Sequence, residues 1–424
     1  MLSVEEARDR ILAMFQPLTP EHVDLLDALG QVLDEDIVSD IKIPPLANSA
    51  MDGYAVQYAD IVTAGPETPV TLNVDGYIAA GQLPDRPVTK GNAIRIMTGA
   101  PIPPGANTVI PFEDTSEYEL KNVGMNPMDI DKVDIKLASS LGSNVRPAGQ
   151  DIEIGEKVLS KGVVLRPGEI GVIASLGRNK VKVIRRPSIA VLATGDELIE
   201  PGRPSEEGRI YDSNSYGVCA SVVKYGGRPT FLGIAQDNLV SMNSKIEEGF
   251  NADMILTSAG VSKGDYDIVK DVLVSRGEID FWSVRMRPAK PLAFGVLFSD
   301  EGKKIPHIGL PGNPVSALVA FEELVRPAIL KMMGYKELDK PTVKAILEDD
   351  IVNSDGRRVY ARAIITNKDG TYYASLTGSQ GSNVLTSMVR ANGLAICPED
   401  VECMKAGQEV EVQMLDWADG GYSR

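Results

Sequence analysis

Four short apolar runs in the middle of the chain each end in a polar loop, and three of these loops open a helical pattern. The runs are too short for buried helices and are bounded by Gly or Pro, as buried strands are. Their alternation with helices predicts a parallel sheet whose loops share one edge, at the carboxyl ends of the strands, where open α/β sheets bind ligands. We therefore expect the active site at this edge. The runs lie at residues 189–193, 229–234, 252–256 and 305–310, and the loops lie at 194–198, 235–237, 257–267 and 309–314.

The composition restricts the class of protein. The chain has 424 residues, more than one hydrophobic core holds, and 43% of them are apolar, so we expect several folded domains. A net charge of -16 and 5% aromatic residues disfavour nucleic-acid binding, because phosphates need a cationic surface and bases need stacking partners. No signal peptide or membrane span is expected. Cys219, Cys397 and Cys403 are scattered, which favours buried thiols in a reduced, cytoplasmic protein.

The sequence contains two histidines, His22 and His307, so few catalytic or metal-binding roles can depend on histidine. We expect His22 on the surface and His307 in a structural position within a short apolar run. A Ser-His-Asp triad or a multi-histidine metal site is therefore disfavoured. Catalysis should depend on carboxylates, cations and backbone amides.

Capping signals predict two helices at the start of the chain. Ser3 begins a capping box, and Thr19 before Pro20 supplies a second cap, so the helices should run to about residues 15 and 29.

The whole chain reads as a multidomain protein with α/β and all-β parts. Residues 44–144 carry short strand patterns and should form a β-rich inserted domain. Residues 187–334 hold the α/β domain with a mostly parallel sheet. Residues 335–424 return to strands, with an Asn-Lys-Asp-Gly hairpin turn, which favours a small C-terminal β-barrel. Residues 1–43 and 145–186 should pack together as an N-terminal helical or mixed domain.

Carboxylates gather on the predicted loop edge. A hard divalent cation such as Mg²⁺ favours a few carboxylates together with phosphate oxygens, so a metal bridge to phosphate is one interpretation. For any single acid, capping of a helix is the alternative, since Asp265 and Asp267 stand where a helix should start. Convergence of the loops favours a polar-ligand or metal site. The acids are Asp196, Glu197, Asp237, Asp265 and Asp267.

Anion-binding features lie on the same domain. Residues 259–264 follow a buried strand and precede a helix, so their amides can face a phosphate, although a plain tight turn is equally compatible. They match neither a Walker loop nor the dinucleotide-binding pattern. Residues 311–316 make a second helix start. Arg287 and Lys290 lie in a proline-stiffened turn that suits an anion, and a surface turn with incidental charges is the alternative.

Seven segments, spread in order over nearly the whole chain, together resemble the molybdopterin molybdenumtransferases, the MoeA family, which includes the E domain of gephyrin. Such a set is far more specific than any one loop. The segments are 44–55 (PPLANSAMDGYA), 95–101 (RIMTGAP), 194–198 (TGDEL), 211–214 (YDSN), 258–267, 287–295 and 310–316 (LPGNPVS).

The resemblance implies the last step of molybdenum cofactor assembly. Adenylylated molybdopterin and molybdate, or tungstate, would react with a divalent metal such as Mg²⁺ to give the cofactor and AMP. It also implies a central domain like that of the MogA proteins and an elongated homodimer whose active sites are shared between subunits. Contacts with the adenylylating enzyme and with apo-molybdoenzymes are further implied partners.

The resemblance also assigns roles to residues. Glu197, Asp237 and Asp267 would hold the metal and the pyrophosphate, with Arg287 and Lys290 on the anions. Three catalytic residues would come from the partner subunit, namely Asp52, Thr98 and Asp151. Substrate-binding residues would be Thr194, Gly195, Asp196, Ser258, Gly260, Ser262, Gly264, Pro311, Gly312, Asn313 and Ser316, with Arg362 and Ser382 for molybdate.

Three positions depart from the family pattern. Ala259 and Ala289 stand where the family usually has glycine. Asn383 and the residue after it stand where the family commonly has a Ser-Arg pair. Alanine favours a negative φ, whereas glycine tolerates a positive one, so these changes bear on the loop paths. Two other functions stay open: a molybdopterin adenylyltransferase, which would use ATP on the pterin, and a non-catalytic scaffold of the gephyrin type.

Overall fold

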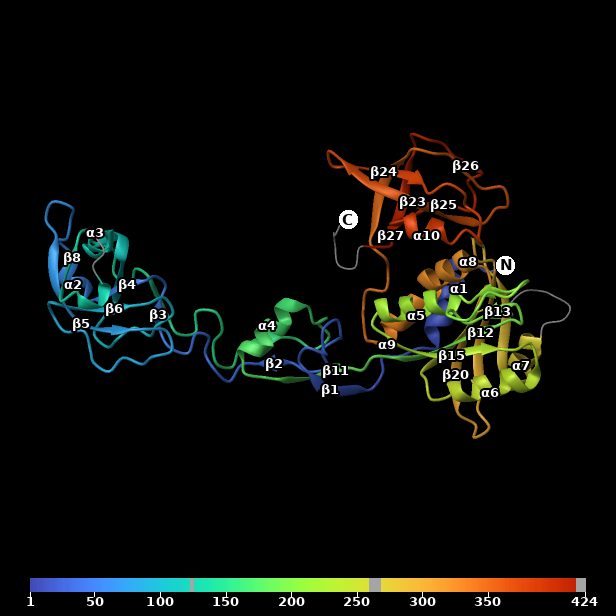
Figure 1. The fold of residues 1–424 in the computed structure, drawn as a ribbon, viewed down its shortest axis with the longest axis horizontal. Helices are drawn as coiled ribbons and strands as arrows, with labels where there is room; N and C mark the ends of the chain where they lie inside the picture. Colours follow the sequence, from blue (N-terminus) through green and yellow to red (C-terminus); the bar gives the residue numbers. More distant parts are fainter. Residues whose placement is uncertain (123–125, 259–267, 417–424) are drawn as a thin grey trace. The chain divides into compact units, whose positions relative to one another are not determined.

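The computed structural model describes residues 1–122, 126–258 and 268–416 and divides into two compact units (Figure 1). The first unit comprises Met1–Asp34, Val164–Arg166 and Val181–Arg424, and the second comprises Glu35–Val163 and Pro167–Lys180. The division into four domains, with finer boundaries, stays a prediction. Within the described ranges, no helix combines the length and the apolar character needed to cross a bilayer.

The α/β part of the first unit is built on a six-stranded sheet with the strand order β15-β12-β16-β20-β19-β17. The first four strands are parallel, and β19 and β17 add two antiparallel neighbours. The four predicted runs all form strands of the parallel part, so the predicted mostly parallel sheet is confirmed. The strands are β12 (Ser188–Thr194), β15 (Arg228–Ala235), β16 (Met254–Ser258), β17 (Gly277–Ser283), β19 (Pro291–Phe298) and β20 (Lys304–Leu310).

Helices cover both faces of this sheet, because alternate strand residues point to opposite sides. Ile189 and Val191 of β12 pack with the helices α1, α5, α8 and α9, whereas Ala190 and Leu192 pack with α6 and α7. Burial on both faces explains why the strands read as continuous apolar runs. The helices are α1 (Val4–Ala13), α5 (Asn214–Lys224), α6 (Leu239–Gly249), α7 (Ile268–Arg276), α8 (Pro314–Ala320) and α9 (Arg326–Met332).

One of the two predicted N-terminal helices is present and the other is wrong. The capping box of Ser3 and Glu6 begins α1, as predicted. Residues after Thr19 form a strand instead, β1 (Pro20–Asp24), which pairs with β11 (Lys180–Ile184). The side chains of β1 alternate between exposed and half-buried, so pairing with a distant strand overrides the local capping signal.

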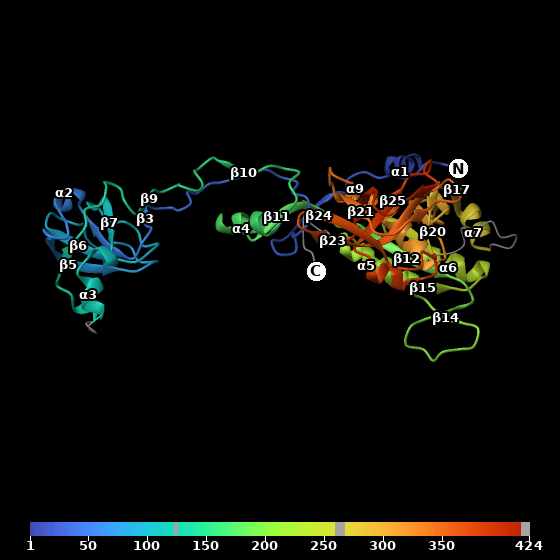
Figure 2. The same cartoon turned by 90° about the horizontal axis from the view of Figure 1, so that it is seen from above.

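The second unit is rich in strands, as predicted, and Figure 2 shows it from above. Its five-stranded sheet has the order β7-β4-β6-β5-β8, with the short helices α2 (Tyr58–Ile61) and α3 (Glu117–Asn122). A longer helix, α4 (Pro167–Ser175), belongs to the same unit. The strands are β4 (Gly53–Val56), β5 (Val70–Ile78), β6 (Asn92–Ile96), β7 (Thr108–Pro111) and β8 (Lys132–Ile135).

The C-terminal part of the first unit is a small barrel, as predicted. Its sheet closes because β25 pairs both with β27 and with β23. The hairpin between β23 and β24 turns at Asp369 and Gly370, which both have positive φ, as a type I′ turn requires. A short strand of the α/β part, β18 (Met286–Arg287), pairs with β23. The barrel strands are β21 (Thr342–Leu347), β23 (Arg358–Lys368), β24 (Thr371–Leu376), β25 (Gly393–Cys397) and β27 (Glu409–Met414).

Candidate functional site

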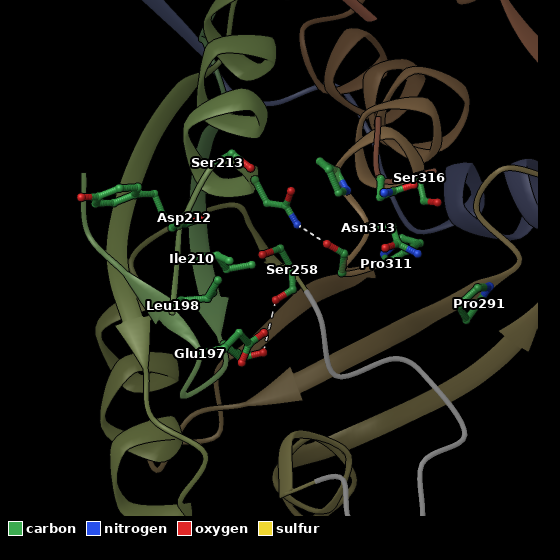
Figure 3. Close-up of a pocket in the computed structure, with 16 residues that line it drawn as sticks. Glu197, Leu198, Ile210, Asp212, Ser213, Ser258, Pro291, Pro311, Asn313 and Ser316 are labelled. Carbon is green, nitrogen blue, oxygen red and sulfur yellow. Dashed lines mark hydrogen bonds between the residues drawn. The ribbon is translucent and has the colours of Figure 1, made fainter. Parts of the chain in front are cut away.

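A cavity of about 590 Å³ lies at the carboxyl ends of β12, β16 and β20, at the edge predicted for the active site (Figure 3). All the residues that line it belong to the first unit. Members of the predicted substrate-binding set that line the cavity are Thr194, Ser258, Pro311, Gly312, Asn313 and Ser316, and they are joined by the predicted metal ligand Glu197.

Hydrogen bonds between neighbouring loops hold the cavity wall in place. The hydroxyl of Thr194, which is buried at the end of β12, donates to the carbonyl oxygen of Ser258 at 3.2 Å. The side-chain amide of Asn214, at the start of α5, donates to the carbonyl oxygen of Gly312 at 2.7 Å. These bonds join β12 to β16 and α5 to the turn before α8, so the polar groups of three loops face one space (Figure 3).

The predicted acids Asp196, Glu197 and Asp237 are exposed at the ends of β12 and β15. The carboxylate of Asp196 accepts a hydrogen bond from the backbone nitrogen of Asp237 at 3.1 Å, which ties the two loops together. Gly195 has a φ of 136°, and a Cβ there would lie 2.4 Å from Oε2 of Glu197. The positive φ therefore favours a glycine at this position, and with a Cβ there the exposed carboxylate of Glu197 would have to lie elsewhere.

The cationic turn lies next to the cavity, since Pro291 lines it and the turn immediately precedes Pro291. Arg287 is half-buried and Lys290 is exposed. Between them, Ala289 has a φ of 79° and is 5% exposed. The backbone therefore keeps the left-handed conformation that suits a glycine, although the residue is alanine.

Arg362 is the largest fully buried side chain in the described part of the protein. Its guanidinium donates to the hydroxyl of Ser387 at 3.2 Å and to the carbonyl oxygens of Tyr360 at 3.4 Å and Gly381 at 3.3 Å. Burial, and then repulsion from Arg287, lower the pKa of Arg362 to about 10. Among the described residues no carboxylate pairs with it, so a buried positive charge lacks its counterion.

The loop that follows Gly381 links this arginine to the cavity. The carbonyl oxygen of Ser382 accepts a hydrogen bond from the backbone nitrogen of Val315 at 3.1 Å, at the start of α8. The next residue, Asn383, lines the cavity together with Ser316. A buried cation and a cavity with acids on its edge are therefore neighbours within the first unit.

The three predicted catalytic residues outside the α/β part all belong to the second unit. Asp52 accepts hydrogen bonds from the backbone nitrogen of Thr98 at 2.7 Å and from its hydroxyl at 2.8 Å, so this predicted pair is in direct contact. Asp151 is exposed, and its backbone nitrogen donates to the carbonyl oxygen of Ile43.

Other residues in the same motifs have a structural part in the second unit. Arg95 makes a bidentate ion pair with Glu117, at 3.0 and 2.6 Å, and Glu117 also accepts from the hydroxyl of Tyr54 at 2.5 Å. The guanidinium of Arg95 also stacks on the ring of Phe112 at 4.3 Å. This cluster anchors the strand that ends just before Thr98.

Part of the predicted site lies outside the described residues, namely Ala259, Gly260, Ser262, Gly264, Asp265 and Asp267. Elsewhere in the described chain, no three His, Cys, Asp or Glu side chains are grouped as metal ligands. The metal set of Glu197, Asp237 and Asp267 therefore stays a prediction. His22 is exposed and His307 is buried, as expected, and desolvation lowers the pKa of His307 to about 3.

Three family models match successive parts of the chain. The MoeA N-terminal region (domain I and II) matches residues 2–177, the probable molybdopterin binding domain matches residues 190–331, and the MoeA C-terminal region (domain IV) matches residues 344–415. A molybdopterin molybdenumtransferase 2 of Mycobacterium tuberculosis is 36% identical over 422 residues, which cover 97% of this chain and 99% of the relative. The chain belongs to the MoeA family of molybdopterin molybdenumtransferases.

Further MoeA-family proteins agree with this assignment. The molybdopterin molybdenumtransferase of Haemophilus influenzae is 34% identical over 421 residues, or 97% of this chain and 98% of the relative. A molybdopterin biosynthesis MoeA protein of Pyrococcus horikoshii has the same fold, with a TM-score of 0.77 and 31% identity, and the match covers 98% of this chain and 100% of that one. The predicted membership of the MoeA family and the predicted fold class are confirmed.

Several cavity residues were not predicted as site residues. The segment at 211–214 was recognised as a MoeA-family motif, but its side chains were given no role. The apolar wall formed by Leu198 and Ile210 carries no pattern that marks it as a binding surface. The unpredicted lining residues are Leu198, Ile210, Tyr211, Asp212, Ser213, Asn214, Pro291, Pro314 and Asn383.

Proposed function

We propose that this MoeA-family enzyme inserts molybdenum into adenylylated molybdopterin and releases the finished cofactor and AMP. Molybdate is the oxyanion, with tungstate as an alternative. The observation that carries the proposal is the buried Arg362, which has no acidic partner in the described chain and lies next to a cavity edged by carboxylates. A buried cation of this kind is stabilised by a bound anion.

The positive groups would serve the anions. The guanidinium of Arg362 donates hydrogen bonds to backbone carbonyl oxygens and a hydroxyl, and these neutral groups do not compensate its charge. An oxyanion beside it would therefore accept charge-assisted hydrogen bonds. Ser382 is close in the chain to its partner Gly381 and would add a hydroxyl. Arg287 lies near enough to Arg362 to lower the pKa of Arg362, so both can act on the same anion, and Lys290 would extend the positive field.

The carboxylates would serve a metal on the phosphate side. Glu197 and Asp237, with Asp267, offer only oxygen donors, which fit Mg²⁺ or another hard divalent cation. When bound, the cation would neutralise the pyrophosphate oxygens and stabilise AMP as the leaving group. The protein's own residues position two anions that repel each other, the oxyanion and the pyrophosphate. Water would attack the phosphate that stays with the pterin, its oxygen would join that phosphate, and AMP would leave, so no protein nucleophile is needed in this reaction.

The active site would be completed by a second copy of the chain. Asp52, Thr98 and Asp151 would reach the substrate from the partner subunit in a homodimer. The arrangement of Asp52 and Thr98 suits this role, since both side chains are exposed and the hydrogen bonds between them fix their relative positions. We also place the enzyme in the cytoplasm, where it would meet the adenylylating enzyme and the apo-molybdoenzymes.

The test is AMP release from adenylylated molybdopterin by the purified protein with Mg²⁺, with and without molybdate. Release that depends on molybdate supports the proposed function. Release without any dependence on molybdate or tungstate would contradict it. Formation of adenylylated pterin from ATP would instead identify an adenylyltransferase.

A further inference from the structure

Asp212 is a buried acid on the wall of the cavity. It is 1% exposed, it lies just before α5, and it lines the cavity. Its Oδ1 accepts a hydrogen bond from the backbone nitrogen of Ser215 at 3.0 Å. Its Oδ2 is buried and has no hydrogen-bond partner among the described residues. Burying a carboxylate oxygen without a hydrogen-bond partner costs free energy. Because Asp212 lines a cavity, a bound ligand could supply the missing hydrogen-bond donor.

The neighbouring atoms support the same conclusion. The hydroxyl of Ser258, which also lines the cavity and is 2% exposed, has no partner within the described part of the chain. Apolar side chains complete this side of the cavity, since Ile210 and Tyr211 line it while 60% and 44% exposed. Prolines at 291, 311 and 314 add further apolar surface. Small-molecule sites typically combine apolar surface with a few placed polar groups, and this side of the cavity offers both.

The chemistry of the unpaired oxygen selects one edge of such a ring. An ionised carboxylate accepts hydrogen bonds and cannot donate them, so it must face N–H or O–H groups. A pterin presents a ring N–H beside an amino group, which are two donors side by side. The pairing edge of adenine presents an amino group beside a ring nitrogen that is an acceptor, and this acceptor would face the carboxylate with the wrong polarity.

We infer that Asp212 is a specificity-determining residue that accepts hydrogen bonds from the N–H edge of the pterin ring. This inference rests on the proposed function for the identity of the substrate, and it adds which part of the substrate occupies this wall of the cavity. Ser258 provides a second polar contact for the ring, and Ile210 and Tyr211 cover its flat surface.

The test compares two rings that differ at this edge alone. Lumazine carries an oxo group where pterin carries the amino group, so a carboxylate should bind pterin better. Binding of 6-hydroxymethylpterin and of 6-hydroxymethyllumazine is measured by fluorescence titration, for the wild-type protein and for Asp212→Asn. The asparagine keeps an oxygen that can accept from the backbone nitrogen of Ser215, so α5 should keep its start, and the melting temperature checks this.

The expected result is a preference of the wild-type protein for the pterin by about tenfold or more, since a hydrogen bond to a charged group contributes that much. Asp212→Asn should reduce or abolish this preference. Asp280→Asn is the matched control, because Asp280 is exposed on β17 and does not line the cavity. This control removes the same charge and should leave both affinities unchanged.

Two results would overturn the inference. One is equal binding of both rings by the wild-type protein and by Asp212→Asn. The other is a loss of AMP affinity in Asp212→Asn with pterin affinity intact, which would assign the carboxylate to the hydroxyls of the ribose. Failure of the proposed function is seen separately, because a protein that discriminates between the rings through Asp212 but releases no AMP with molybdate refutes only the transferase reaction.

Discussion

The guanidinium of Arg362 lies 3.2 Å from the hydroxyl of Ser387, and this neutral group stands where a buried arginine ordinarily has a carboxylate. The remaining hydrogen bonds of Arg362 go to carbonyl oxygens, which carry only partial charge. The positive charge is thus oriented by the barrel without being neutralised by it. An oxyanion is the ligand that such an arrangement favours.

Replacement of this arginine should weaken the use of molybdate. In Arg362→Met we expect the molybdate concentration for half-maximal AMP release to rise by about tenfold or more, since charge-assisted hydrogen bonds are lost. The melting temperature should stay the same or rise, because an unpaired buried charge is removed. Titration of molybdate in the AMP-release assay measures the first effect. An unchanged molybdate dependence would exclude Arg362 from the oxyanion site.

Replacement of the edge acids should change the response to metal. Glu197→Gln and Asp237→Asn keep the size of each side chain but remove a charge, so we expect half-maximal AMP release to need several times more Mg²⁺. Folding should be unaffected, because both side chains are exposed. AMP release as a function of Mg²⁺ concentration tests this, with Asp280→Asn as the control. Equal activity of both variants at every metal concentration would remove the two acids from the mechanism.

Two variants, each strongly impaired alone when Mg²⁺ is limiting, should restore activity when they are mixed. In a dimer with shared sites, Asp52→Asn and Glu197→Gln impair different halves of each site. Random exchange of subunits then gives mixed dimers with one intact site, and about a quarter of the wild-type activity should return. The measurement is AMP release after co-refolding or co-expression. A monomer by light scattering that is fully active would contradict this arrangement.

The backbone at Ala289 gives a prediction about stability. Its φ of 79° is costly for alanine, by about 1 kcal/mol, and glycine avoids this cost but is more flexible when unfolded. We therefore expect Ala289→Gly to be neutral or to stabilise by up to about 1 kcal/mol, and Ala289→Val to destabilise by more than that. Ala293→Gly, at a buried strand position, is the control and should destabilise. Urea unfolding followed by tryptophan fluorescence measures the differences.

The buried histidine should make stability depend on pH. His307 has a pKa of about 3 in the folded protein against 6.5 unfolded, so the unfolded chain binds the extra proton between these values. Stability should therefore fall as the pH decreases from 6.5 toward 3, by at most about 1.4 kcal/mol for each pH unit from this group. His307→Gln should be less sensitive to acid, whereas His22→Gln, at an exposed site, should behave as the wild type. Thermal melts across this pH range compare the three proteins.

The sequence predicted the parts of the fold whose signals are local. The four parallel strands are continuous apolar runs because both faces of their sheet are buried, and periodicity detects such runs. The hairpin turn was also predicted from local sequence, because the adjacent residues Asp369 and Gly370 are a pair that favours such a turn. The strand β1 was missed because its pairing with β11 brings together residues far apart in the chain, and a capping signal at Thr19 pointed to a helix.

The candidate site divides in the same way. The loops at the strand ends predicted Glu197, and the family resemblance added Thr194 and Ser258; all three line the cavity. By contrast, Asp212 could not be distinguished from an ordinary helix-capping acid, because its unpaired oxygen is visible only once the surrounding side chains are placed. The burial of Arg362 was also not predicted, since charged side chains are usually exposed and the loop that covers this one, at Gly381 and Ser387, is distant in the sequence.

The pairing of β18 with β23 has a structural consequence. Met286 is in register with Arg358, and Arg287 with Val359, so the strand that carries Arg287 is hydrogen-bonded into the barrel that also carries Arg362. The same strand leads within a few residues into β19 of the α/β sheet. The backbone segments that carry Arg287 and Arg362 therefore belong to one hydrogen-bonded sheet, and the chain that leaves this sheet after Arg287 leads directly to Pro291 on the wall of the cavity.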